Sequence, residues 1–241
     1  MKLMFIRHGE PNYAIDSLTE KGWREAELLK ERLLKMDMTK IYCSPLGRAK
    51  DTAKPTLEAL GREADVRGWL REFDGCAAVP DPGASGCLWD RLPSVLYGHD
   101  ELYDKNKWIR VPFYDSEHNR EKYAGVCRGI DEVLAENGYV HDKNVFRVER
   151  ANKNTLVFFC HYGVICVILS HLLNLSPVTL WQGFVALPTS VTTLATEERE
   201  EGTAIFRMSS FGDLSHLYAA GEPASFHARF CEMYKEKDVR H

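Results

Sequence analysis

The sequence lacks an apolar run long enough to cross a membrane. The apolar segment 164–169 falls far short of the roughly 20 residues that a spanning helix needs, and it predicts a buried helix instead. Residues 1–6 are too short for the apolar core of a signal peptide. We therefore expect neither a membrane span nor a membrane partner.

Paired cysteines are missing as well. The seven cysteines are odd in number, lack regular spacing and form no Cys-x-x-Cys motif, which argues against a zinc site or a disulfide framework. Cys43, Cys160 and Cys166 fall in apolar segments, where a reduced core thiol is usual. No group of His, Asp, Glu and Cys has the spacing of metal ligands. We expect no metal, no cofactor and a reducing, cytoplasmic setting.

Charge of one sign does not accumulate along the chain. The 31 Lys and Arg stand against 35 Asp and Glu, a formal net charge of -4, and the basic residues are scattered. Binding to nucleic acid usually requires a clustered basic surface, so no nucleic-acid partner is expected. Internal repeats and low-complexity tracts are also absent from the sequence.

The sequence does contain the tripeptide Arg7-His8-Gly9, directly after the apolar run 2–6. This run predicts a short buried strand. Side chains at the carboxyl end of a parallel strand reach the crevice in which ligands bind. Gly9 allows the backbone to turn sharply. A fixed cation beside a titratable nitrogen is suited to handling phosphate.

A second strand-like run, 40–43, leads into a predicted helix. Ser44 is a good N-cap and Pro45 a good first helical residue, so the helix is expected to begin there. This start places Arg48 about one turn into the helix, at the carboxyl edge of the strand.

Two further segments bring polar side chains toward the same edge. Segment 69–75 holds Glu72 between apolar residues. Segment 155–160 predicts a buried strand that delivers His161 to the carboxyl edge. Two histidines and two arginines are therefore expected to converge at one edge of a sheet.

These four motifs, in this order, resemble the phosphoglycerate-mutase-like branch of the histidine phosphatase superfamily. The resemblance covers residues 2–22, 40–75 and 155–217. It implies that His8 is the nucleophile that becomes phosphorylated, and that Glu72 donates a proton to the leaving group. It also implies a phosphate pocket made by Arg7, Arg48 and His161, of which His161 is counted with the catalytic residues.

Two positions depart from the family pattern. Tyr162 stands where a second glycine usually follows the second histidine, so its side chain must lie near the pocket or point away from it. We count it with the substrate-binding residues. Ala14 stands where an asparagine is common, and Asn12 is expected to substitute for it. Pro11 and Tyr13 disfavour the acid-phosphatase branch of the superfamily.

Alternating strands and helices in the first and last thirds predict an α/β fold. We expect a three-layer helix-sheet-helix sandwich with a mostly parallel central sheet, folded as a single domain over 1–241. The other expected elements are helices over 19–36 and 116–137, a kink or early stop at Pro55 in the second helix with Gly61 as its end, and an antiparallel hairpin of 191–194 with 204–208.

Residues 76–115 match no motif of the family. They begin with a loop composition and continue with aromatic side chains interleaved with charges. We expect an inserted cap over the active site; the alternative is a loop packed on the core with no ligand role. The side chains expected to choose the substrate are Trp89, Tyr97, Tyr103, Trp108, Arg91 and Arg110.

The favoured function is a metal-independent phosphomonoester hydrolase that acts through a phosphohistidine on His8. Its partners would be a small phosphorylated substrate and inorganic phosphate. One alternative is a cofactor-dependent phosphoglycerate mutase, which is disfavoured because the insertion offers no adjacent arginine pair for a second anionic group. The other is a non-catalytic phosphate-binding module.

Overall fold

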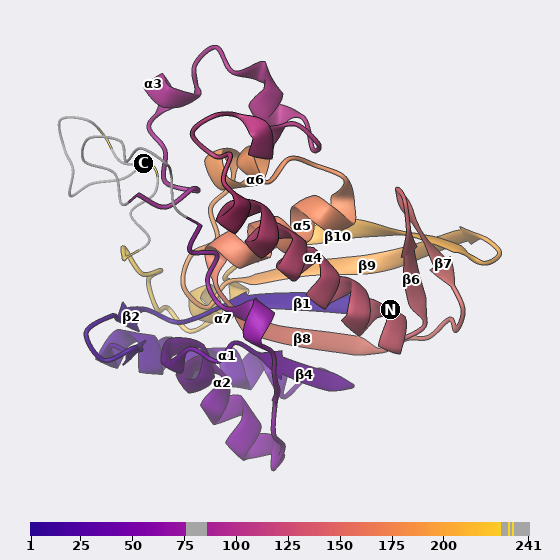
Figure 1. Ribbon diagram of the computed structural model, residues 1–241. Coiled ribbons are helices and arrows are strands. Elements are labelled where there is room, and N and C mark those ends of the chain that lie inside the picture. Colours follow the sequence, from indigo (N-terminus) through magenta and orange to yellow (C-terminus); the bar gives the residue numbers. More distant parts are fainter. Residues whose placement is uncertain (76–85, 228–230, 232, 234–241) are drawn as a thin grey trace.

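The apolar run near the N-terminus forms a strand at the centre of the sheet. The computed structural model describes residues 1–75, 86–227, 231 and 233, and β1 spans Lys2–Arg7 (Figure 1). Leu3 and Phe5 are buried in one apolar cluster, and Met4 and Ile6 in another. Because successive side chains of a strand face opposite ways, β1 must be covered on both faces.

The sheet has eight strands in the order β5-β4-β8-β1-β9-β10-β7-β6. From β5 to β1 the strands are parallel, whereas the neighbours from β1 to β6 pair antiparallel. The strands other than β1 are β4 (Lys40–Cys43), β5 (Asp65–Val66), β6 (Tyr139–Asp142), β7 (Val145–Val148), β8 (Thr155–Cys160), β9 (Val191–Glu200) and β10 (Thr203–Asp213). A separate small pair joins β2 (Pro11–Asn12) to β3 (Ser17–Leu18).

Helices cover both faces of the sheet, which confirms the predicted three-layer α/β class. In Figure 1 the helices α1 (Glu20–Leu33) and α2 (Gly47–Leu60) lie below the sheet, in contact with each other. Helices α4 (Glu117–Glu136), α5 (Tyr162–Leu173) and α6 (Pro177–Gly183) cover the other face, and α4 crosses in front of the strands in Figure 1. The short helix α7 (Ser215–Ala219) packs against α1.

Several predicted boundaries match the structure. Thr19 caps α1 by accepting a hydrogen bond from the Gly22 N–H at 3.1 Å. Ser116 caps α4 in the same way. The predicted hairpin is formed by β9 and β10, although both strands extend further into solvent than the apolar segments indicated.

The predicted start of α2 and an early stop at Pro55 were wrong, whereas Gly61 as its end is confirmed. Leu46, rather than Ser44, is its N-cap residue, so Arg48 is the second residue of the helix. The helix also runs on through Pro55 to Leu60 and ends at Gly61, whose φ of 59° is left-handed. Pro55 is buried, and packing of this face offsets the hydrogen bond that a proline cannot make.

The described part of the predicted insertion, 86–115, is mostly short helices: α3 (Pro93–Leu96), η2 (Asp100–Tyr103) and η3 (Trp108–Arg110). In Figure 1 this segment lies above α6. The first part of the insertion, 76–85, lies outside the described residues. Trp108 and Tyr114 are fully buried in the same core cluster as α4 and α5. Part of the insertion is therefore core structure.

Candidate active site

Three strands end side by side where the candidate site lies. Cys160 pairs with Arg7, and Cys43 pairs with Phe159, so β1, β8 and β4 finish at the same edge. The next residue after each strand is His8, His161 or Ser44, respectively. The imidazole rings of His8 and His161 have their centroids 5.1 Å apart. The predicted convergence of the two histidines is therefore present in the fold.

The backbone fixes the ring of His8. Its Nδ1 lies 2.8 Å from the carbonyl oxygen of Gly9, which can only accept, so Nδ1 carries the proton and Nε2 keeps a lone pair. His8 is 2% exposed. Burial lowers the pKa of His8 well below its usual value, and the charges of Arg7 and Arg48 lower it further. His8 is thus held as a neutral imidazole with one free nitrogen lone pair.

The loop after His8 is joined closely to α1 and α2. A Cβ added to Gly9 would lie 2.9 Å from the carbonyl oxygen of Gly22, so a side chain does not fit there. The Gly9 N–H donates to Oγ1 of Thr52 at 2.9 Å, and that hydroxyl donates to the Arg48 carbonyl at 2.7 Å. These contacts fix the turn that carries the carbonyl partner of His8.

His161 is held from the other side by Ser44. Its Nε2 lies 2.8 Å from the Ser44 hydroxyl oxygen, and the residue is fully buried. Burial lowers the pKa of His161 well below its usual value, as do its neighbours His8, Arg48 and Arg7. Its other ring nitrogen, Nδ1, has no hydrogen-bond partner among the described residues.

Arg7 is anchored by one arm of its guanidinium. Its Nη1 donates to the carbonyl oxygen of Ala186 at 2.6 Å, and its Cζ lies 5.8 Å from the centre of the Tyr162 ring. Arg7 is 7% exposed, and its Nε is buried without a partner within the described ranges. The side chain is therefore fixed in place and still has a donor to offer to an anion.

Arg48 is held at the start of α2 by Asp16. Its Nη1 lies 2.6 Å from one carboxylate oxygen of Asp16, and the other oxygen accepts from the Gly47 N–H at 2.7 Å. Partial burial raises the pKa of Asp16, but the hydrogen bonds from Gly47 and Arg48 outweigh it and keep that pKa below its usual value. A Cβ on Gly47 would lie 2.1 Å from the Asp16 carbonyl oxygen, so glycine is required there.

Glu72 is half-buried beside the first turn of α5. Its Oε1 accepts hydrogen bonds from the N–H groups of Phe73 at 2.8 Å and Val164 at 3.2 Å. Burial raises the pKa of Glu72 above its usual value, against the effect of these bonds and of Arg7. A Cβ on Gly163 would lie 2.7 Å from this Oε1, which explains the glycine at that position. The carboxyl can therefore hold a proton near the histidines.

Tyr162 and Asn12, predicted from the sequence to bind substrate, each use a side-chain oxygen in a hydrogen bond to the backbone. The Tyr162 hydroxyl lies within 2.8–3.3 Å of three carbonyl oxygens near the end of α6, those of Leu180, Trp181 and Phe184. The Asn12 side-chain oxygen accepts from the Ala14 N–H at 3.2 Å, within its own exposed loop. Tyr162 contributes its ring beside Arg7, and a substrate contact by Asn12 would have to use its amide nitrogen.

The sequence did not reveal the positioning roles of Ser44, Asp16 and Thr52. Ser44 was interpreted as a helix cap, although its place directly after a strand gave the signal that it belongs to the site. Asp16 has no signal in the sequence, because it reaches Arg48 only through the loop that β2 and β3 form. Thr52 lies four residues, or one helical turn, after Arg48 on α2. This spacing is the sequence signal that the two side chains share one face of the helix.

The charge of the site suits an anion. Buried nitrogen atoms of Arg7, Arg48 and His161 lack partners in the part of the chain that the structure describes, and those of the two arginines are N–H donors. Buried polar groups are rarely left unpaired, so these donors indicate where a bound oxyanion would sit. A cation would instead meet two arginines, so the histidine pair is a poor metal site.

A family model for the histidine phosphatase superfamily, branch 1, matches residues 3–77. This segment contains His8, Arg48 and Glu72 and stops before the second histidine. A probable phosphatase of Schizosaccharomyces pombe is 26% identical over 231 residues, which is 90% of this chain and 95% of the relative. The adenosylcobalamin/alpha-ribazole phosphatase of Salmonella typhimurium is 26% identical over 199 residues, 75% of this chain and 84% of that protein.

Solved structures share the fold. A phosphoserine phosphatase of Entamoeba histolytica in complex with phosphoserine matches 90% of this chain and 98% of its own, with a TM-score of 0.58 and 20% identity. A mycobacterial glucosyl-3-phosphoglycerate phosphatase matches 88% and 98%, with a TM-score of 0.57 and 19% identity. The chain thus matches the histidine phosphatase superfamily, branch 1, over residues 3–77, which hold His8, Arg48 and Glu72, and it shares its fold with phosphatases over nearly its whole length.

Proposed function

We propose that the chain hydrolyses small phosphate monoesters through a phosphohistidine on His8. The observation that carries the proposal is the buried, neutral His8, whose Nδ1 is fixed by the Gly9 carbonyl, among unpaired buried nitrogen atoms of Arg7, Arg48 and His161. A fixed neutral imidazole is a competent nucleophile. Arg7 and Arg48 supply the positive charge that phosphoryl transfer needs to neutralise the charge on the phosphoryl oxygens.

The first step forms the covalent intermediate. Nε2 of His8 attacks phosphorus, the bond from phosphorus to the ester oxygen breaks, and that oxygen leaves with the bonding pair. Glu72 gives its proton to the departing oxygen, which leaves as an alcohol. The raised pKa of Glu72 keeps the carboxyl protonated over a wider pH range than that of an exposed glutamate.

The second step restores the enzyme. Water attacks phosphorus, Glu72 now accepts a proton from that water, and the bond between phosphorus and Nε2 breaks. The products are inorganic phosphate, neutral His8 and protonated Glu72. Arg7, Arg48 and His161 hold the phosphoryl oxygens in both steps, so the chemistry needs no metal ion.

Phosphatase action is favoured over a mutase. The curated relatives with 26% identity have phosphatase names. A mutase must bind a second anionic group, yet Arg91 is buried with its Cζ 5.2 Å from the centre of the Phe113 ring. Arg110 lines a surface hollow with His99, Glu101 and Lys107. The described part of the insertion therefore provides no adjacent arginine pair for that group.

The cap role of 76–115 is proposed for the part around Trp89. A Cβ on Gly163 would lie 2.9 Å from the Trp89 ring and 2.7 Å from Glu72, so ring and carboxyl adjoin. The backbone carbonyl oxygen of Trp89 accepts a hydrogen bond from the side-chain amide of Gln182 at 3.2 Å. We propose that Trp89 walls the side of the pocket where the leaving group departs. Trp108 packs in the core instead.

The substrate class follows from the site and the relatives. Phosphoserine and glucosyl-3-phosphoglycerate are named for structural neighbours, and both are small phosphate monoesters. We propose a substrate of this size. Inorganic phosphate release from sugar phosphates, nucleotides, phosphoamino acids and phosphoglycerates tests the proposal, with interconversion of 2- and 3-phosphoglycerate as the mutase assay. Interconversion faster than phosphate release would overturn the hydrolase assignment.

Trp89→Ala and Trp108→Ala form a matched pair for the cap. Trp89→Ala should change the ranking of substrates while a small aryl phosphate is still hydrolysed at a near-normal rate. Trp108→Ala should destabilise the fold by about 3–5 kcal/mol and affect all substrates alike. A lower melting temperature with unchanged ranking in Trp89→Ala would contradict the cap proposal.

A further inference from the structure

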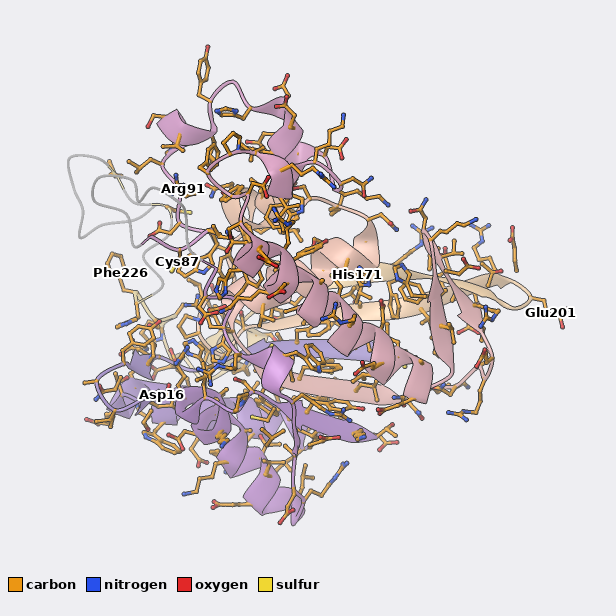
Figure 2. The ribbon with its side chains drawn as sticks, viewed as in Figure 1. Asp16, Cys87, Arg91, His171, Glu201 and Phe226 are labelled. Carbon is orange, nitrogen blue, oxygen red and sulfur yellow. The ribbon has the colours of Figure 1, made fainter. Side chains whose placement is uncertain are left out.

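A second group of ionisable side chains meets far from the active site. Asp131 on α4, His141 on β6 and His171 on α5 come together in the fold. His171 lies ten residues beyond His161, near the other end of α5, about 15 Å along the helix. Figure 2 shows His171 well separated from Asp16 of the active-site loop.

The ligand atoms of these residues are close enough to share one ion. Nε2 of His171 lies 2.8 Å from one carboxylate oxygen of Asp131, and Nδ1 of His141 lies 3.3 Å from the other. Atoms of all three residues lie within 4.8 Å of one another. Tetrahedral ligands at the usual 2.0–2.2 Å from zinc are about 3.3–3.5 Å apart, so small shifts would complete the geometry.

The surroundings are suited to a structural ion. The side chains of Asp131, His141 and His171 are 30%, 20% and 15% exposed, so an ion can enter from solvent while most of the site stays packed. The His141 ring stacks on Phe146 at 4.9 Å, which restricts its rotation. Cys127 adjoins His171 and is 8% exposed. Its thiol or a water molecule is available as a fourth ligand.

The alternative explanation is a simple ion pair without metal. Burial opposes the charge of His171, but its hydrogen bond to Asp131 outweighs this and raises the pKa of His171 to about 10. The carboxylate can therefore hold the histidine as a cation in the metal-free protein. A divalent ion bound here would take the place of this proton, which is released on binding.

We propose that Asp131, His141 and His171 bind one divalent ion of the zinc type, which ties α4, β6 and α5 together. Two imidazole nitrogens, a carboxylate oxygen and a nearby thiol prefer zinc and its first-row neighbours over magnesium or calcium. The ion is structural, because the proposed phosphoryl transfer uses none of these residues. The proposal stands whether or not the chain is a phosphatase.

Metal binding to the full-length protein is the direct test. After chelation and dialysis, titration with Zn²⁺ should show one tight equivalent per chain, and Co²⁺ should give the visible absorption of a tetrahedral centre. Mg²⁺ should not compete. At a Zn²⁺ concentration 100 times its Kd, the melting temperature should rise by about 5–10 °C. Absence of a tight equivalent in the wild-type protein would overturn the proposal.

Two variants distinguish this group from the active-site pair. His171→Gln should abolish the tight equivalent and the rise in melting temperature. His8→Ala, which removes one imidazole of the other pair, should retain both. The metal-free melting temperature of each variant shows whether it folds. If His171→Gln does not fold, Asp131→Asn takes its place in the test. Loss of binding in His8→Ala, or its retention in both cluster variants, would overturn the assignment.

Discussion

Two pairs of histidines meet within the described residues, and their neighbours give them opposite properties. His8 and His161 have ring centroids 5.1 Å apart at the edge of the parallel strands. His141 and His171 are 4.5 Å apart beside α4. Burial lowers the pKa of both imidazoles of the first pair, and the nearby Arg7 and Arg48 lower it further. The second pair shares Asp131, which raises the pKa of His171.

The comparison shows that the charge of the neighbours decides what an imidazole can do. A neutral ring with a free lone pair and nearby cations can attack a phosphoryl group and leave its oxygens bound. A ring beside a carboxylate holds a proton or a metal ion instead. The spacing of histidines along the chain carries none of this information, because the two members of each pair come from different elements.

The largest expected difference between the pairs is in catalysis. His8→Ala should lower the rate of phosphate release by about 10⁴-fold or more, since it removes the nucleophile. His171→Ala should leave the rate within about twofold. Brief exposure of the wild-type enzyme to labelled substrate should trap acid-labile, base-stable phosphate on His8. Full activity of His8→Ala would reject the nucleophile assignment.

The carboxyl beside the first pair should act as an acid. Glu72→Gln should slow the hydrolysis of esters with poor leaving groups by about 10²–10⁴-fold, the usual range for a lost general acid. An aryl phosphate with a good leaving group should lose much less, because it departs without a proton. Gln retains an oxygen for the N–H groups of Phe73 and Val164. Equal losses on both substrates would mean that Glu72 only positions the substrate.

Titration of the imidazoles tests the comparison directly. In the metal-free protein, NMR should find His171 protonated up to a pKa of about 10, with His8 and His161 titrating below 6.5. The stability that protonated His171 contributes is complete below about pH 6.5 and is lost as pH rises toward 10. The free energies of unfolding of the wild type and His171→Asn should therefore differ most near pH 6. A difference between these free energies that grows with rising pH would contradict the prediction.

The smallest expected effect extends the same argument to a third group, Glu25. It is fully buried on α1, accepts from the Glu10 N–H at 2.8 Å, and among the described residues has Lys21 as its ion-pair partner, at 4.0 Å. Burial raises the pKa of Glu25 to about 7. Wild-type stability should therefore fall as pH rises from 4.5 to 7, by about 2–3 kcal/mol relative to Glu25→Gln. Parallel pH profiles of the two proteins would show that Glu25 has an ordinary pKa.

The strongest sequence predictions depended on local patterns. The apolar runs 2–6 and 155–160 predicted buried strands correctly, because a strand covered on both faces needs an uninterrupted apolar segment. Thr19 predicted the start of α1, since capping involves only neighbouring residues. The α/β class followed from the alternation of these elements. The antiparallel half beyond β1 was predicted only in part, and the β6-β7 hairpin was missed.

Other expectations could not be settled from local patterns. Trp89 and Trp108 both lie in the stretch of aromatic side chains interleaved with charges, so the sequence does not tell them apart. Of the two, Trp108 is fully buried, because neighbours distant in sequence decide burial. Within the described residues no helix is long and apolar enough to cross a membrane. The cytoplasmic setting and the site roles stay predictions.

The sequence by itself determined the elements and the order of the motifs that mark the family. Its local signals suffice because strands, caps and turns depend on residues a few positions apart. Only the tertiary structure decided which charges meet: Asp16 with Arg48, Ser44 with His161, and Asp131 with two histidines. The sequence predicted no metal ligands because Asp131, His141 and His171 approach one another only through packing. The pKa of a side chain depends on burial and on neighbouring charges, and folding creates both.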